Sequence, residues 1–180
     1  MTCYNASAIM MTSKYEIEQK YKIDSPIYIR RLLKILGARI LNQGFELNEF
    51  WDQGRLLRRH KSVLRLRKTD LRSSLAYKSD TLRHRYTKRI EHETAVDYPQ
   101  TREILRHLNF RCWRRYKKFR ETYRLRSALI TLDKLPGSRW YLEIEGSPAA
   151  IRRIASKLEL PPSRQVKKSY LEILFPKDFR

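Results

Sequence analysis

Residues 15–21 read Tyr-Glu-Ile-Glu-Gln-Lys-Tyr, and charged side chains occupy alternate positions of this segment. Successive side chains of a β-strand point to opposite faces of the sheet, so Glu16, Glu18 and Lys20 would share one face. The apolar and aromatic side chains of the segment would lie mainly on the other face. The alternation predicts a half-buried strand whose polar face carries charges of both signs.

The same two-residue period returns along the chain, often with basic and acidic residues on one face. With 15–21, the segments that show it give about eight predicted strands: 63–68, 76–78, 88–94, 118–120, 131–133, 142–145 and 168–173. Three amphipathic helices are predicted between them, each beginning with a polar cap followed by proline. They begin at Ser25-Pro26, near Asp97–Pro99 and at Ser147-Pro148, and they end at Gly37, Asn109 and Pro161-Pro162.

The composition is that of a folded and strongly basic protein. The 180 residues include 40 Lys plus Arg against 19 Asp plus Glu, which gives a formal net charge of +21. Because 41% of the residues are hydrophobic and 11% are aromatic, a disordered polycation is excluded. The charge indicates an anionic partner and leaves nucleic acid, a membrane surface and a phosphorylated small molecule open.

Further features bound the class of protein. No run approaches the roughly 20 apolar residues of a membrane-spanning helix, so we expect a cytoplasmic protein with no membrane span. Cys3 and Cys112 are too few for a disulfide framework and lack the spacing of a zinc site. The chain has no glycine-rich P-loop motif, which excludes that class of nucleotide hydrolase. We expect residues 1–13 to be a loose leader and residues 14–180 to form a single domain.

Charges at every second residue usually mark the solvated face of a sheet. That interpretation accounts for each strand alone, but not for the repeated pairing of carboxylates with basic residues in strand after strand. If the sheet closes into a barrel, its inner face can be polar while helices cover an apolar outer face. Inward carboxylates would hold a divalent metal ion, and inward Arg and Lys side chains would hold polyphosphate oxygens.

Several strands carry motifs in the order found in one known family. Residues 16–20, Glu-Ile-Glu-Gln-Lys, resemble the ExExK signature of the CYTH domain, the family of triphosphate tunnel metalloenzymes. The other matching segments are 65–67 (RxR), 77–78 (lysine), 89–93 (RxExE), 118–120 (KxR), 132–133 (LD), 141–145 (acidic) and 168–170 (closing). The resemblance extends from Lys14 to the region of Leu174, which is nearly the whole chain.

The resemblance implies an α+β protein, an eight-stranded antiparallel closed β-barrel with helices packed outside. It implies one or two Mg²⁺ or Mn²⁺ ions in the barrel, held by Glu16, Glu18, Glu91, Glu93, Asp133, Glu143 and Glu145. Phosphate oxygens would be bound by Lys20, Arg65, Arg67, Lys78, Arg89, Lys118, Arg120 and Lys168. The catalytic residues would be Glu16, Glu18, Lys20 and Lys78, and we expect no histidine to act in catalysis.

Two activities divide the family, hydrolysis of a triphosphate and cyclisation of ATP by class IV adenylate cyclases. Cyclisation needs an adenine pocket, and no residue here can be assigned to one. We therefore expect a metal-dependent triphosphatase with an inorganic or organic triphosphate as substrate, and an adenylate cyclase as the alternative. The basic and aromatic residues 113–117 leave a second alternative, a non-catalytic module that binds polyphosphate or nucleic acid. Weak electrostatic binding to polyanions is also expected, and the chain could be a monomer or a homodimer.

Overall fold

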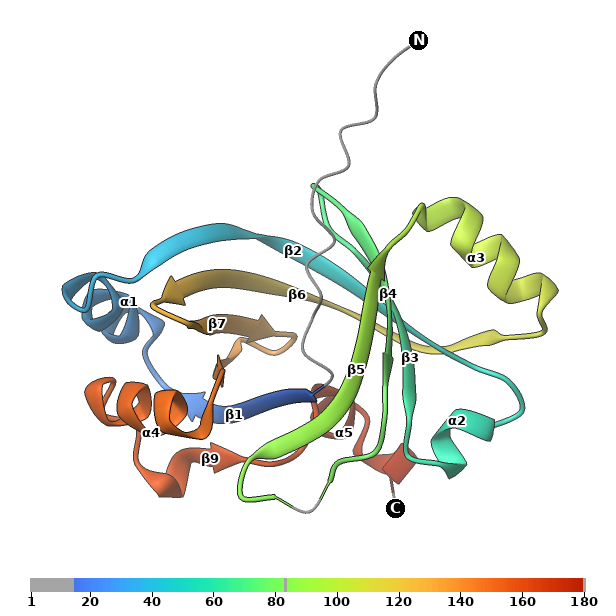
Figure 1. Cartoon of the computed structure of the whole chain (residues 1–180). Coiled ribbons are helices and arrows are strands. Elements are labelled where there is room, and N and C mark those ends of the chain that lie inside the picture. The colour runs from blue at the N-terminus through green and yellow to red at the C-terminus, as the bar shows by residue number, and fades with distance from the viewer. Residues whose placement is uncertain (1–14, 83, 180) are drawn as a thin grey trace, which may run out of the picture.

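The computed structural model describes residues 15–82 and 84–179, and its main feature is a closed β-barrel (Figure 1). The barrel strands are β1 (Tyr15–Ile23), β2 (Arg39–Asp52), β3 (Val63–Lys68), β4 (Ser73–Lys78), β5 (Thr87–Ala95), β6 (Arg111–Leu125), β7 (Ala128–Leu135) and β8 (Arg139–Glu145). They lie in the order β5-β4-β3-β2-β6-β7-β8-β1, and antiparallel pairing of β1 with β5 closes the ring. The predicted α+β fold with an eight-stranded antiparallel barrel is confirmed. The leader expected at 1–13, with Cys3, lies outside the described residues.

Strand β2 is not predicted by the alternation of charge. Glu46 and Glu49 lie on opposite sides of the strand, and both side chains are buried. Polar side chains therefore occupy both faces of β2. β2 nevertheless forms a long antiparallel ladder with β6 that runs from Arg39 to Asp52. Period-two patterning identifies strands with one wet and one dry face, whereas β2 is exposed on both faces over Arg39–Gln43 and buried on both over Asn48–Asp52.

The prediction of a strand at 168–173 is wrong. Residues Tyr170–Leu174 form a short helix, α5, while the nearest strand is β9 (Gln165–Val166), which pairs with β1. The Ser169 hydroxyl accepts a hydrogen bond from the Glu172 N–H, and the Glu172 carboxylate accepts one from the Ser169 N–H. This reciprocal capping box is typical of a helix start, and it explains why alternating polar residues here do not form a strand.

The three predicted helices are present as α1 (Pro26–Ile35), α3 (Tyr98–His107) and α4 (Pro148–Lys157). Each has a proline near its start and a side-chain cap, supplied by Ser25, Asp97 and Ser147 respectively. Shorter helical segments are α2 (Leu56–Arg59), η1 (Pro162–Arg164) and η2 (Pro176–Phe179).

The helices bury their apolar faces against the outside of the barrel. Leu33 of α1 and Ile151 of α4 are fully buried in one core with strand residues such as Leu142. Leu105 of α3 packs in a second core with Trp51 and Leu66. In Figure 1, α1 and α4 lie together at one end of the barrel and α3 at the other. Burying each such side chain contributes about 1.5–3 kcal/mol, so the helices fix the barrel from outside and leave its interior to charged groups.

Candidate active site in the barrel interior

Strand β1 turns the charged face predicted from the sequence into the barrel. Glu16 lies opposite Arg89 in the ladder with β5. Its carboxylate accepts hydrogen bonds from Arg89 Nε at 2.7 Å and from Lys78 Nζ at 2.9 Å. Glu18 lies opposite Glu145 of β8, and its Oε1 is 3.7 Å from Arg89 Nη2. The predicted metal-binding and phosphate-binding residues of this region therefore contact one another directly.

Strands β3, β4 and β5 continue the network. Lys78 Nζ, which bonds Glu16, also donates to Glu91 Oε2 at 2.9 Å. Arg65 Nη2 lies 3.4 Å from a carboxylate oxygen of Glu91 and 3.3 Å from one of Glu93. Each predicted carboxylate of β5 is thus bound to a basic side chain from β3 or β4.

A second part of the network is centred on Asp133, whose side chain is fully buried. Its Oδ1 accepts a hydrogen bond from Arg120 Nε at 2.6 Å, and its Oδ2 accepts from Arg120 Nη2 at 2.5 Å and from Lys118 Nζ at 3.2 Å. Arg120 also donates to Glu143 at 2.7 Å, and Lys20 Nζ lies 3.2 Å from Glu143. Asp133 and Glu143 together hold three of the predicted phosphate-binding cations.

Some residues of the interior are not predicted by the sequence, among them Glu46 and Tyr170. Glu46 of β2 is buried, with carboxylate oxygens 3.5 Å from Lys118 Nζ and 3.7 Å from Arg67 Nη1. Tyr170 of α5 is also buried, and its hydroxyl donates to Asp133 Oδ2 at 2.8 Å. Glu46 lies opposite Lys118 in the β2–β6 ladder, and this pairing would place Glu46 in the interior. The pairing can be inferred from the sequence only if β2 is first recognised as a strand.

The side chain of Lys168 is not brought into the network. It is exposed, and in the described part of the chain only its backbone carbonyl contacts the site, by accepting a hydrogen bond from Lys20 Nζ at 3.3 Å. Because Lys168 precedes α5 rather than lying on a barrel strand, its side chain does not follow the inward alternation. The remaining predicted phosphate-binding residues all lie in the interior.

The carboxylates around β1 repel one another. Burial, together with the charges of Glu143 and Glu16, raises the pKa of Glu18. Solvent reaches Glu145, yet partial burial and the nearby Glu16 and Glu18 raise its pKa to about 7. Burial acts to raise the pKa of Glu16 too, but Lys78 and Arg89 outweigh it and hold that pKa well below its usual range.

The basic side chains around β6 show the opposite effect. Burial and the neighbouring guanidinium of Arg120 lower the pKa of Lys118 to about 8. Burial and the charge of Arg65 also lower the pKa of Arg67. The interior therefore contains carboxylates and cations whose charged forms burial and like-charged neighbours disfavour, beside others, such as Glu16, in which the counter-charges dominate.

The donor set fits a hard divalent cation by its chemistry, because carboxylate oxygens are the ligands that Mg²⁺ and Mn²⁺ prefer. Within 15–82 and 84–179, however, no three His, Cys, Asp or Glu side chains are already arranged as a metal site. The carboxylates are instead bound to Lys and Arg. Two buried interior atoms, Glu46 Oε2 and Arg65 Nε, have no hydrogen-bond partner among the described residues. The carboxylates of the network are thus paired with basic side chains, but not every buried polar atom of the interior has a hydrogen bond.

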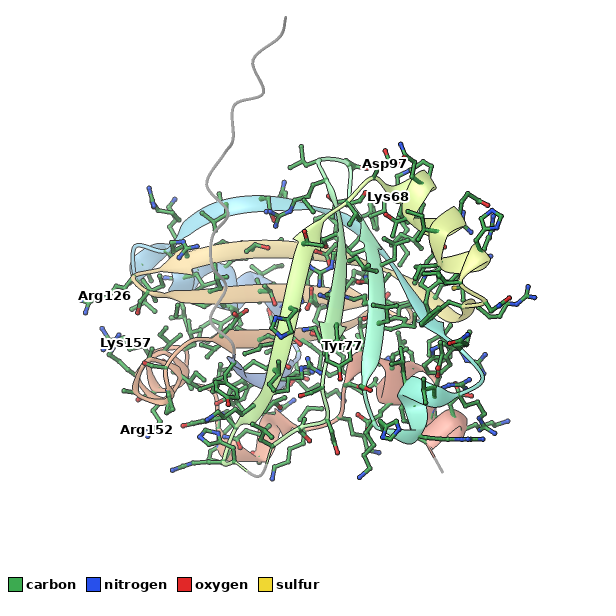
Figure 2. The ribbon with its side chains drawn as sticks, turned by 45° about the vertical axis from the view of Figure 1, so that its right-hand side comes forward. Lys68, Tyr77, Asp97, Arg126, Arg152 and Lys157 are labelled. Atoms are coloured by element: carbon green, nitrogen blue, oxygen red, sulfur yellow. The ribbon has the colours of Figure 1, made fainter. Side chains whose placement is uncertain are left out.

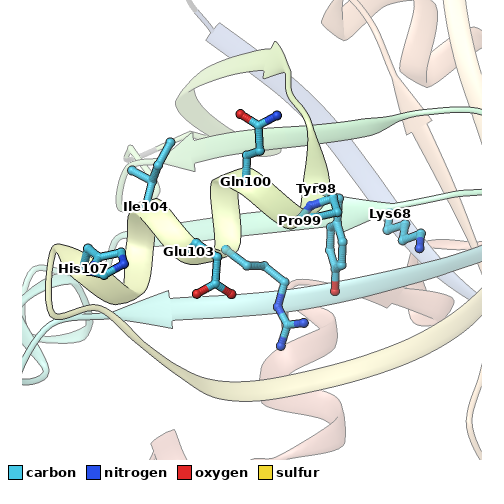
Figure 3. A pocket seen from close by; sticks show the side chains of 8 residues that line it. Lys68, Tyr98, Pro99, Gln100, Glu103, Ile104 and His107 are labelled. Carbon is cyan, nitrogen blue, oxygen red and sulfur yellow. The ribbon is translucent and has the colours of Figure 1, made fainter.

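Other reactive groups lie away from this network. The four histidines, at positions 60, 84, 92 and 107, are exposed, and so is the free thiol of Cys112. A pocket of about 600 Å³ lies beside α3, where Figure 3 shows Tyr98 and His107 along its wall with Lys68. It contains no pair of carboxylates and shares no residue with the interior. No helix in the described ranges is long and apolar enough to cross a bilayer.

Comparison with known proteins places this barrel in a family. The family model described as the CYTH domain matches residues 14–170. The chain belongs to the CYTH family. Members of this family bind triphosphate substrates and generally depend on a metal ion. The family assignment agrees with the resemblance seen in the strand motifs.

Individual relatives resemble this CYTH protein over most of its length. "Putative adenylate cyclase MJ0240" of Methanocaldococcus jannaschii is 26% identical over 170 residues, covering 88% of this chain and 97% of the relative. The PH1012 protein of Pyrococcus horikoshii OT3 is 25% identical, with a TM-score of 0.75 over 87% of this chain and 98% of that one. HpAC1 from Hippeastrum is 20% identical, with a TM-score of 0.71 over 90% and 96% of the two chains.

Proposed function

We propose that the barrel interior binds a metal-bound triphosphate and hydrolyses it. The observation that carries the proposal is the enclosure of carboxylates and cations in one interior, where burial and neighbouring carboxylates raise the pKa of Glu18 and Glu145, and burial and neighbouring guanidinium groups lower the pKa of Lys118 and Arg67. Like charges held close together in a protein interior are costly unless a ligand of opposite charge joins them. A divalent cation would relieve the acidic group, and triphosphate oxygens would relieve the basic group.

The acidic group would hold the metal. Glu16 and Glu18, with Glu143 and Glu145, would bind one or two Mg²⁺ or Mn²⁺ ions. A bound ion of this kind lowers the pKa of a water molecule and neutralises phosphate charge. The protein's task is to hold these carboxylates ionised, and the basic side chains that contact Glu16 and Glu143 do so before substrate arrives.

The basic group would hold the triphosphate. Phosphoryl transfer depends mainly on positioning and on neutralising spread negative charge, which guanidinium and ammonium groups supply. Arg65, Arg67, Lys118 and Arg120 would donate to phosphate oxygens, with Lys20 and Arg89 beside the carboxylates of β1. Each of these cations is already held by a carboxylate of the interior, so substrate binding exchanges one set of ion pairs for another.

Asp133, Glu91 and Glu93 would act by positioning the cations. Asp133 is enclosed by Lys118, Arg120 and the hydroxyl of Tyr170, which together use both of its oxygens. Glu91 and Glu93 contact Arg65, and Glu91 also holds Lys78. These three acids therefore aim the phosphate-binding side chains and leave metal binding to the carboxylates of β1 and β8.

The alternative reaction is cyclisation of ATP by an adenylate cyclase. The M. jannaschii relative carries that name, whereas HpAC1, which is also called an adenylyl cyclase, is said to have a dominant triphosphatase activity. Both reactions begin with a triphosphate in the barrel. Hydrolysis needs only water at the attacked phosphorus, so the interior network suffices for it, and this favours the triphosphatase.

Product analysis separates the two reactions. Purified protein is incubated with inorganic triphosphate and with ATP, each with Mg²⁺ or Mn²⁺, and the products are followed by ³¹P NMR and chromatography. We expect orthophosphate or pyrophosphate to be released and little cyclic AMP to form. Cyclic AMP as the main product from ATP, with no turnover of inorganic triphosphate, would establish the cyclase instead.

A second experiment tests the remaining alternative, a module that binds polyphosphate without turnover. The double variant Glu16→Ala/Glu18→Ala removes two interior carboxylates, and the matched control Asp70→Ala/Glu103→Ala removes two exposed ones. An enzyme should lose metal-dependent turnover by orders of magnitude in the first variant only. A binding module would keep or improve its affinity for triphosphate in both variants and would show no turnover in the wild type.

A further inference from the structure

Helix α1 presents apolar side chains to solvent as well as to the core. Its inner side is anchored by Ile29 and Leu33, which are buried. On the other side, Ile27 and Ile35 are 73% and 70% exposed. Arg31 lies four residues from each of these isoleucines, and Lys34 lies three residues after Arg31. Residues three or four apart are neighbours on a helix surface, so the four side chains form one continuous row. We call Ile27, Arg31, Lys34 and Ile35 the α1 outer face.

Exposed apolar side chains are concentrated in this part of the chain. Among the described residues, fourteen large hydrophobic side chains are substantially exposed, and five of them lie between residues 27 and 41. Besides the two isoleucines of the α1 outer face, these are Tyr28, Ile40 and Leu41, the last two at the start of β2 directly after the turn that ends α1. Single exposed apolar side chains are ordinary on protein surfaces, whereas a concentration of them indicates an interaction site.

The charges of this end of the molecule are positive. Arg31 and Lys34 are exposed, and neither forms an ion pair within the described ranges. Helix α4 lies at the same end of the barrel and adds further cations, of which Figure 2 shows Arg152 and Lys157 projecting outward. Neither α1 nor α4 contains an acidic residue.

Two acidic side chains lie close to α1, and both already have partners. Asp24, just before the helix cap, pairs with Arg164 at 2.6 Å. Glu159, just after α4, accepts a hydrogen bond from the Tyr28 hydroxyl at 2.6 Å. These acids therefore do not neutralise the cations of the α1 outer face.

The combination of isoleucine with unpaired cations favours one kind of partner. A nucleic acid would pair with the cations, but it would place charged phosphates against the isoleucines. A second copy of this face would bring Arg31 and Lys34 against the same charges. An anionic lipid surface suits both kinds of side chain, because its headgroups attract Lys and Arg while apolar side chains enter the boundary between headgroups and acyl chains.

We propose that the α1 outer face binds the surface of an anionic lipid bilayer. Ile27 and Ile35 enter the boundary between headgroups and acyl chains, and Arg31 and Lys34 pair with the anionic headgroups. The helix stays docked on the barrel, because its inner side remains buried in the core. Binding is therefore peripheral and reversible. It uses no residue of the barrel interior, so the inference does not rest on the proposed triphosphatase activity.

The test measures sedimentation of the full chain with vesicles made of equal parts of phosphatidylserine and phosphatidylcholine, at several salt concentrations. Each cation near such a surface raises the affinity about fivefold, so Arg31→Glu/Lys34→Glu should weaken binding at least ~20-fold. Ile27→Gln/Ile35→Gln should weaken it at least ~10-fold, because less apolar surface leaves water. This second variant keeps its cations, so its remaining binding should still fall as salt is added. Vesicles of phosphatidylcholine alone should bind the wild type far more weakly.

Two matched controls change exposed side chains outside α1 and α4. Leu71→Gln/Ile104→Gln removes two exposed apolar side chains, and Arg72→Glu/Arg111→Glu reverses two exposed cations, which lowers the net charge as much as the charge variant of α1 does. We expect both controls to bind within ~3-fold of the wild type. Hydrolysis of triphosphate in solution should be the same in all four variants, and thermal melting confirms that each is folded before binding is compared.

Several outcomes would overturn the proposal. The first is absence of wild-type binding to the anionic vesicles, and the second is equal weakening in the α1 variants and the controls. Unchanged binding by Ile27→Gln/Ile35→Gln would reduce the interaction to attraction by total charge and would reject insertion. Tighter binding of the wild type to duplex DNA than to the vesicles would assign the surface to nucleic acid instead.

Discussion

Asp133 is the residue on which the buried charge network most depends, and its replacement by asparagine tests that network. The side chain is fully buried and accepts hydrogen bonds from Arg120, Lys118 and Tyr170. Asparagine has nearly the same volume but carries no charge, and its amide group points a donor at groups that are themselves donors. Lys118 and Arg120 would stay buried with one counter-charge fewer.

The expected cost follows from this geometry. Removing one partner of a buried ion pair costs about 3–5 kcal/mol, because the other charge is left without compensation. Glu46 and Glu143 still share Arg120 in the variant, so we expect the lower end, about 3 kcal/mol. In a chain of this length, each kcal/mol shifts Tm by about 2–4 °C, which gives a decrease of about 6–12 °C.

Calorimetry of Asp133→Asn at pH 7 measures this shift without metal or substrate. The matched control is Glu103→Gln, which breaks the exposed pair between Glu103 and Arg106 on α3. Exposed pairs contribute about 0–1 kcal/mol, so the control should melt within about 4 °C of the wild type. A decrease of less than 2 °C for Asp133→Asn, relative to that control, corresponds to about 1 kcal/mol or less. It would show that Lys118 and Arg120 do not need this counter-charge, and would refute the reasoning.

Three further changes have directions fixed by the structure. Tyr170→Phe removes one hydrogen bond to the Asp133 carboxylate and should cost about 1.5–3 kcal/mol in urea unfolding; no change would mean that the bond does not stabilise the fold. Because the pKa of Glu145 is raised to about 7, folding favours its protonated form, and this contribution is lost as the pH rises from about 4.3 through 7. Glu145→Gln should therefore be more stable than the wild type at pH 8 and equal to it near pH 4, and equality at both would contradict the shift. Glu46→Gln frees Lys118 and Arg67 from a competing carboxylate and should lower KM for triphosphate in steady-state assays, whereas a raised KM would assign Glu46 to binding.

Much of the barrel and its interior could be predicted because the strands obey one simple rule. Glu16, Glu18 and Lys20 lie two residues apart, and closure of the sheet turns all of them inward. The same rule places Arg65, Arg67, Lys118 and Arg120 correctly in the interior. Alternation in a single strand does not say whether the polar face is wet or enclosed, so the repetition of mixed charges over many strands was needed to indicate a barrel.

The errors arise where local chemistry or pairing overrides that rule. Glu46 escapes prediction because β2 also buries Glu49 on its other face, where Arg102 Nε lies 3.3 Å away. Lys168 is misplaced because the capping box of Ser169 and Glu172 begins a helix within an alternating segment. The role of Tyr170 depends on how α5 packs against the barrel, which no local pattern specifies.

The most direct test of the account is a crystal structure with Mn²⁺ and a non-hydrolysable triphosphate analogue, with the metal located by its anomalous signal. The account predicts the analogue inside the barrel, with its phosphate oxygens bonded to Lys118 and Arg67. It places the metal on Glu16 and Glu18, and Lys78 should then have left Glu16, to which it is bonded at 2.9 Å without ligand. An analogue bound only outside the barrel, or bound inside with the Lys78–Glu16 pair intact and no metal on the carboxylates, would contradict it.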